Sequence, residues 1–95
     1  AKIALKNALD RLSDDINFQQ VIINNYFVNE ASRLVLLKAS PAMQSNEDQQ
    51  AIIKAIDAIG HFRQYLHSII QIGNMAEKAI KDDEETKEEI LREAL

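Results

Sequence analysis

Residues able to perform chemistry are few, and the two histidines are the strongest candidates in a chain without cysteine. His61 and His67 are six residues apart, which on a helix separates them by about 120° and nearly two turns. They are therefore poorly placed to share a metal ion. Asp57 precedes His61 by four residues, a spacing that favours a hydrogen bond on a helix surface over a catalytic pair.

Sequence motifs for catalysis or cofactor binding are also missing. The chain has no glycine-rich phosphate loop, no serine nucleophile elbow, no H-E-x-x-H pair and no calcium-binding loop pattern. Catalysis needs a nucleophile or an acid–base pair held in a pocket. We therefore expect a protein that is not an enzyme, with no catalytic, cofactor-binding or metal-ligating residue.

The charge and hydropathy of the chain limit the classes of partner that it can bind. The formal net charge is −4, and the whole of it comes from residues 81 to 95, whereas binding to a phosphate backbone needs a basic face. Nucleic acid is therefore disfavoured, although His61 to His67 mixes aromatic, basic and amide groups. No apolar run approaches the roughly 18 residues of a membrane span, and no signal peptide is recognisable. We expect a cytoplasmic protein that does not enter a membrane.

The composition predicts an all-α fold in a single domain, residues 1 to 95. Glycine occurs twice and proline once, while 46% of the residues are apolar, and this combination favours long helices. Two main helices should form an antiparallel hairpin, with a short helix before it and an acidic helical tail after it. The expected elements are helices at 2–12, 14–39 and 46–80, a loop at 40–46 and the tail at 82–95.

Short polar residues and proline set these boundaries. Ser13-Asp14-Asp15 suits a helix N-cap, and Pro41 cannot continue a helix. Ser45 and Asp48 form an approximate capping box for the next helix. The acidic run from Asp82 to Glu85 favours a fresh helix start or a bend.

One face of the predicted 46–80 helix carries apolar or small residues at alternating spacings of three and four. Such a face is a seam for lengthwise packing against another helix, either within a hairpin or in a self-associating coiled coil. Gly73 in this seam indicates a close helix crossing, or else the helix ends there at Gly73-Asn74. The seam comprises Ile52, Ala55, Ile59, Phe62, Leu66, Ile69, Gly73, Ala76 and Ile80.

The predicted 14–39 helix is apolar in nearly every direction on a 100° wheel. A helix of this kind is buried on several sides, either in the middle of a monomeric bundle or against another chain. The second interpretation makes this helix a protein interface and the fold an oligomeric bundle. The candidate interface residues are Phe18, Ile22, Tyr26, Phe27, Val28, Leu34 and Leu37.

Two stretches carry a resemblance to known proteins. The first begins at Asn17-Phe18-Gln19 and continues through Asn25-Tyr26-Phe27-Val28-Asn29-Glu30-Ala31-Ser32-Arg33-Leu34; the second runs from Ala55-Ile56-Asp57-Ala58-Ile59-Gly60-His61-Phe62 through Gly73-Asn74-Met75-Ala76-Glu77. Across about residues 9 to 80, the chain resembles small, mostly uncharacterised helical proteins that tailed bacteriophages encode among their virion genes. The resemblance implies a virion or assembly component that works in many copies, in the host cytoplasm or within a virion assembled there.

The sequence thus favours a non-enzymatic structural protein that binds itself or larger virion proteins through helix–helix contacts. An alternative is a ligand-sequestering or inhibitor protein, in which Arg33, Tyr26 or His61 would line a small anionic-ligand pocket between protomers. Ala1 in place of methionine and the uncapped Leu95 suggest native ends that are processed or lie beyond these residues. The partner and the copy number are left open.

Overall fold

The computed structural model describes residues 1–94, and they are helical almost throughout. The all-α prediction is confirmed, since no strand occurs among these residues. Leu95, the last residue of the expected tail, lies outside the described range. The elements are α1 (Lys2–Ser13), α2 (Ile16–Phe18), the π-helical segment η1 (Gln19–Glu30), α3 (Ala31–Lys38), the 3₁₀ turn η2 (Pro41–Met43) and α4 (Asn46–Ala94).

The elements α2, η1 and α3 follow one another directly and form a helical rod from residue 16 to residue 38. Asp15 caps the start of this rod, because its Oδ1 accepts hydrogen bonds from the backbone N–H groups of Asn17 at 2.8 Å and Phe18 at 3.0 Å. Pro41 follows the end of the rod and opens η2. The expected 14–39 helix is replaced by three consecutive helical elements over residues 16–38, and the middle one is π-helical.

The turns of η1 are wider than those of an α-helix. A π-helix bonds residue i to residue i+5, so side chains spaced by four or five residues share a face. Phe18, Ile22, Phe27 and Ala31 have this spacing, and each is partly buried. The wider turn therefore gathers onto one side apolar residues that an α-helical wheel spreads around the helix.

The helix α4 is a single uninterrupted rod of 49 residues. It begins after Ser45, whose Oγ accepts a hydrogen bond from the N–H of Asp48 at 3.0 Å. It continues through Gly73 and through the acidic run that starts at Asp82, so neither a helix end at Gly73 nor a break before the tail is present. The residues after Gly73 include no further glycine and no proline, and most are strong helix formers, which explains the continuity.

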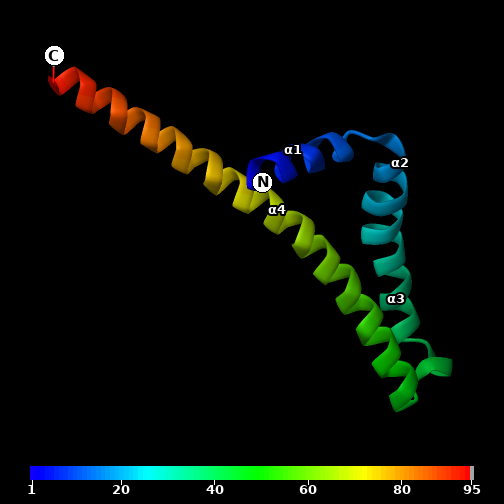
Figure 1. Ribbon diagram of the computed structural model, residues 1–95. Coiled ribbons are helices and arrows are strands. Elements are labelled where there is room, and N and C mark those ends of the chain that lie inside the picture. The colour runs from blue at the N-terminus through cyan, green and yellow to red at the C-terminus, as the bar shows by residue number, and fades with distance from the viewer. Residues whose placement is uncertain (95) are drawn as a thin grey trace.

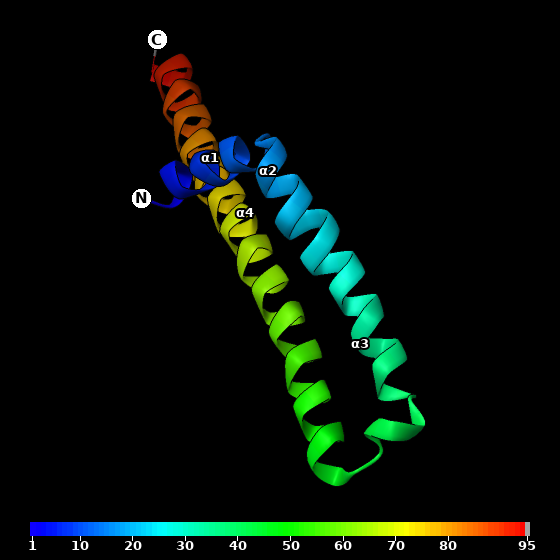
Figure 2. The same ribbon diagram turned by 90° about the vertical axis from the view of Figure 1, so that its right-hand side faces the viewer.

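The rod of α2, η1 and α3 lies beside the first half of α4 and runs in the opposite direction (Figure 2). The turn between them is tied by Gln49, whose Nε2 donates to the carbonyl oxygens of Lys38 at 2.9 Å and Met43 at 2.7 Å. The short helix α1 crosses α4 just past its middle, and the end of α4, from residue 78 to residue 94, projects beyond the other elements (Figure 1). The molecule measures 77 × 29 × 18 Å.

The core between these helices is small. Within residues 1–94 five apolar residues are buried, and three of them, Leu34, Ile52 and Ile59, form one cluster between α3 and α4. Tyr26, Phe27 and Phe62 extend it, with ring centroids 5.6 to 6.2 Å apart. The other two buried apolar residues are Leu9 and Ile69.

The overall dimensions are those of an extended molecule. Its radius of gyration is 21.3 Å, against about 12 Å for a compact domain of this length. Its accessible surface is 7467 Å², roughly 1,900 Å² more than a compact monomer of its mass exposes. Among the described residues, no helix has the length and apolar character needed to cross a membrane.

Candidate interaction surfaces

The seam of α4 faces two different elements along its length. Ile52, Ala55 and Ile59 pack in the cluster with α3, and Phe62 packs against the aromatic residues of η1. Further along, the seam reaches Gly73, over which α1 crosses. Every seam residue from Ile52 to Ala76 is buried or half-buried, whereas Ile80, past the crossing, is exposed.

The crossing of α1 over α4 depends on the missing side chain of Gly73. A Cβ built there would lie 2.5 Å from the Cβ of Lys6, so only glycine admits α1 at this distance. The ammonium group of Lys6 then reaches Glu77, donating to its two carboxylate oxygens at 3.1 and 3.0 Å. Of the two interpretations of Gly73, the structure supports the helix crossing.

The residues predicted as a protein interface lie mostly inside the molecule. Six of the seven are buried or half-buried, and four of these belong to or pack against the core cluster with α4. Only Val28 is exposed. The π-helical turn accounts for this difference, because it directs Phe18, Ile22 and Phe27 to the same side. In a single chain these six side chains therefore expose little surface. The six residues are Phe18, Ile22, Tyr26, Phe27, Leu34 and Leu37.

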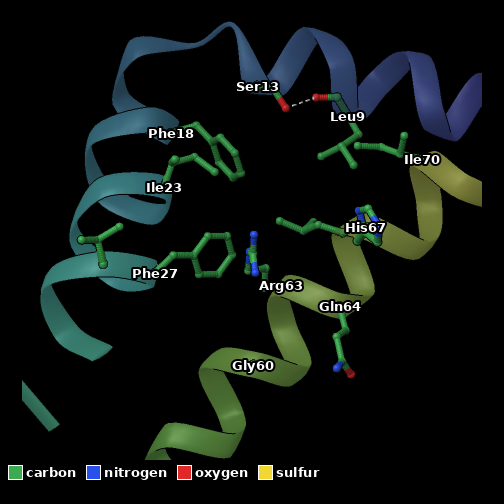
Figure 3. A pocket seen from close by; sticks show the side chains of 12 residues that line it. Leu9, Ser13, Phe18, Ile23, Phe27, Gly60, Arg63, Gln64, His67 and Ile70 are labelled. Atoms are coloured by element: carbon green, nitrogen blue, oxygen red, sulfur yellow. Dashed lines mark hydrogen bonds between the residues drawn. The ribbon is translucent and has the colours of Figure 1, made fainter. Parts of the chain in front are cut away.

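An open groove of about 700 Å³ lies between α1, the first part of the rod formed by α2, η1 and α3, and the middle of α4 (Figure 3). Most of its lining is apolar, and Arg63, Gln64 and His67 of α4 add polar groups along one side. No ion pair in the described part of the chain involves Arg63. The apolar residues that line the groove are Leu9, Phe18, Ile23, Phe27, Val28, Leu66 and Ile70.

The residues considered for a ligand site between protomers have separate environments. Arg33 pairs with Glu30, and its Nε donates to the carboxylate at 3.1 Å. This hydrogen bond lowers the pKa of Glu30 and raises the pKa of Arg33. Tyr26 packs edge-on against Phe62, and His61 is exposed. Of the two histidines, only His67 lines the groove.

No group of three or more histidine, aspartate or glutamate side chains within residues 1–94 could hold a metal ion. Asp57 and His61, the predicted helix-surface pair, are both exposed.

A second apolar face of α4, which the sequence analysis did not single out, is open to solvent. We call it the outer stripe and define it as Tyr65, Ile72, Met75, Ala79 and Ile90. Each of the first four immediately precedes a seam residue, so the stripe lies about 100° around the helix from the seam. The exposed fractions are 58% for Tyr65, 46% for Ile72, 70% for Met75 and 59% for Ile90. This second repeat of three and four was the signal that could have revealed the surface.

A shallow hollow of about 370 Å³ lies at the middle of the outer stripe. Ile72, Met75, Ala76 and Ala79 of α4 form most of it, and Lys2 of α1 borders it. The hollow is apolar apart from this one lysine, so it suits an apolar side chain with an acidic neighbour.

Comparisons with protein-family models, with curated proteins and with solved structures each find no match to this chain.

Proposed function

We propose that this chain is a non-enzymatic helical assembly protein, a hairpin that acts in several copies through helix–helix contacts. The observation that carries the proposal is the imbalance of apolar burial. Among residues 1–94, five apolar side chains are buried, while fifteen large ones are exposed over α1, the rod formed by α2, η1 and α3, and α4. Single exposed apolar residues are ordinary, but extended apolar faces of this kind mark binding surfaces.

The exposed area is large enough for a stable complex. A specific interface needs about 800 Å² from each partner. The chain exposes roughly 1,900 Å² beyond a compact monomer of its mass, so one interface of that size uses less than half of the excess. The projecting end of α4, residues 78–94, is exposed throughout and belongs to this surface.

The resemblance to phage virion proteins gives the proposal a setting. In that setting the chain would be a structural component of a bacteriophage particle, and larger virion proteins would be its further partners. Copies of one helical chain in a particle would contact each other through apolar faces. Exposed apolar residues lie on α1, on the rod formed by α2, η1 and α3, and on α4. The proposed locations are the host cytoplasm and the assembled virion.

The mass of the purified chain in solution tests the proposal. We expect sedimentation equilibrium to give multiples of 10.8 kDa, with the larger species favoured as concentration rises through the micromolar range. A single 10.8 kDa species at every concentration would remove self-association from the proposal.

The open groove favours a second candidate function, the capture of an amphipathic anion. Its volume of about 700 Å³ lies within the range of small-molecule sites. Its apolar lining suits a hydrocarbon body, and Arg63 with His67 suits a carboxylate or phosphate at one end.

A thermal-shift titration with a medium-chain fatty acid, and separately with a nucleotide, tests this candidate. Binding in the groove raises the melting temperature with concentration, and Arg63→Gln removes the rise. Arg92→Gln is the matched control, since Arg92 lies on the projecting part of α4 and should leave the rise intact. An equal rise in melting temperature for the two variants would exclude the groove as the binding site.

A further inference from the structure

We propose that two copies of this chain pair through α4, antiparallel and along the outer stripe. The two helices meet between residues 76 and 79, so Tyr65 of each copy faces Ile90 of the other. This inference rests on the proposed self-association and names the surface and the direction of the contact.

The outer stripe has the spacing of a helix–helix contact. Tyr65, Ile72 and Ala79 follow one another at intervals of seven, Met75 lies between the last two, and Ile90 continues the face three turns beyond Ala79. All five are exposed. The face extends over 26 residues, about 39 Å of helix, which is long enough for a two-stranded coiled coil.

The projecting end of α4 has no buried side chain. Every residue from 78 to 94 is exposed, and the ion pair of Lys6 with Glu77 lies immediately before this end. In proteins most helical stability comes from packing of an apolar face, and none of the 17 residues of this end is buried. Packing along a second copy gives Ile90 and Ala79 an apolar environment and supports the helix.

Charge decides the direction of pairing. The end of α4 carries seven acidic and three basic side chains, so a parallel dimer would place two acidic ends side by side. Residues 58–76 contain no aspartate or glutamate, and they carry Arg63, His61 and His67. Antiparallel pairing places each acidic end along this acid-free stretch of the other copy and therefore avoids the repulsion.

The centre of the stripe is shaped for close approach. Ala79 of the stripe is small, and Ala76 of the seam borders the hollow beside it, so a second helix can approach the backbone there. The adjoining hollow of about 370 Å³ receives an apolar side chain such as Met75 of the second copy. In this register Asp83 of the second copy lies opposite Ile72, near Lys2 at the edge of the hollow, where it meets an opposite charge.

Single cysteines report the direction of pairing directly, because the chain contains no cysteine of its own. We would prepare Tyr65→Cys and Ile90→Cys in full-length chains, one with a mass tag, and oxidise them separately and mixed. Antiparallel pairing gives a disulfide-linked heterodimer in the mixture and little cross-linking of either variant alone. Leu36→Cys, at a position 75% exposed and outside the stripe, is the control and should not cross-link with either variant.

The contrary outcomes are distinct. Cross-linking of each variant with itself and not with the other means parallel pairing and overturns the inference. No cross-link in any combination, while sedimentation still shows a dimer, moves the interface to another surface and leaves the proposed function standing. A chain that is monomeric throughout overturns both.

A pair of double variants supplies a readout that does not depend on cross-linking. Ile72→Glu with Met75→Glu places like charges at the centre of the stripe, so we expect at least a tenfold weaker dimer by sedimentation, with helicity retained in circular dichroism. Val35→Glu with Leu36→Glu changes two residues of α3 that are 60% and 75% exposed, and it should leave the dimer unchanged. The reverse ranking of the two variants would contradict the inference.

Discussion

The two glycines of α4 have different surroundings. A Cβ at Gly73 would lie against Lys6, whereas a Cβ at Gly60 would meet no other atom within 4 Å. Glycine inside a helix costs about 1 kcal/mol relative to alanine. At Gly73 the docking of α1 offsets this cost, but at Gly60 no packing contact explains it.

Alanine at each glycine should therefore change stability in opposite directions. Gly60→Ala should stabilise the chain by up to about 1 kcal/mol, because only the helix preference changes. Gly73→Ala should destabilise it by about 1–2 kcal/mol, since the added Cβ displaces Lys6 and its contact with Glu77. Denaturant unfolding of the two variants measures both values, and the same sign for both would contradict the crossing.

At the scale of elements, the helical class and the seam were within reach of sequence reasoning. The composition and the spacing of the apolar residues were enough to predict the helical class and the seam, because the seam residues keep an α-helical spacing from Ile52 to Ala76. The burial of the rod formed by α2, η1 and α3 could not be predicted from the sequence. Its apolar residues were placed on an α-helical wheel, whereas η1 has wider turns. Backbone hydrogen bonding of that kind leaves no residue signature in Gln19–Glu30.

The projecting end of α4 gave a second difference between sequence and structure. The acids at Asp82 to Glu85 suggested a helix start, because carboxylates stabilise N-termini. In a helix that continues, the same carboxylates are simply exposed along its sides. The position of α1 over α4 depends on the crossing at Gly73, and the spacing of residues along the sequence does not specify it.

The contact between α3 and α4 should depend on a few side chains. Ile59 is 6% exposed and clusters with Leu34 and Ile52. Ile59→Ala should cost about 2–4 kcal/mol, because it leaves a cavity in a core that has few other buried residues. Ile53→Ala in the same helix is the control, and at 36% exposed it should cost less than about 1 kcal/mol. Chemical denaturation checks both variants, and similar losses would contradict the position of the core.

At the scale of the whole molecule, shape distinguishes this chain from a compact bundle. The long axis of 77 Å is set by α4 alone, and the other elements cover only its first part and its middle. An elongated shape leaves more surface per residue and fewer buried side chains than a globule of equal length. The small core and the exposed outer stripe both follow from this elongated shape.

Small-angle scattering can test this shape directly. In dilute solution, where a monomer predominates, we expect a radius of gyration near the 21.3 Å of the structure. A value near 12 Å, as expected for a compact chain of 95 residues, would mean that α4 folds back on itself. Adding salt should leave the monomer unchanged, because one ion pair between helices contributes little to its shape.

Because α4 is uninterrupted, its length also sets a fixed distance between its two ends. A helix of 49 residues rises about 1.5 Å per residue, so groups attached near its two ends are held about 70 Å apart. Surface substitutions leave this separation unchanged, because the backbone ladder of hydrogen bonds sets it. In any assembly that contains this chain, the length of α4 would fix the distance between whatever is bound at its covered end and at its projecting end.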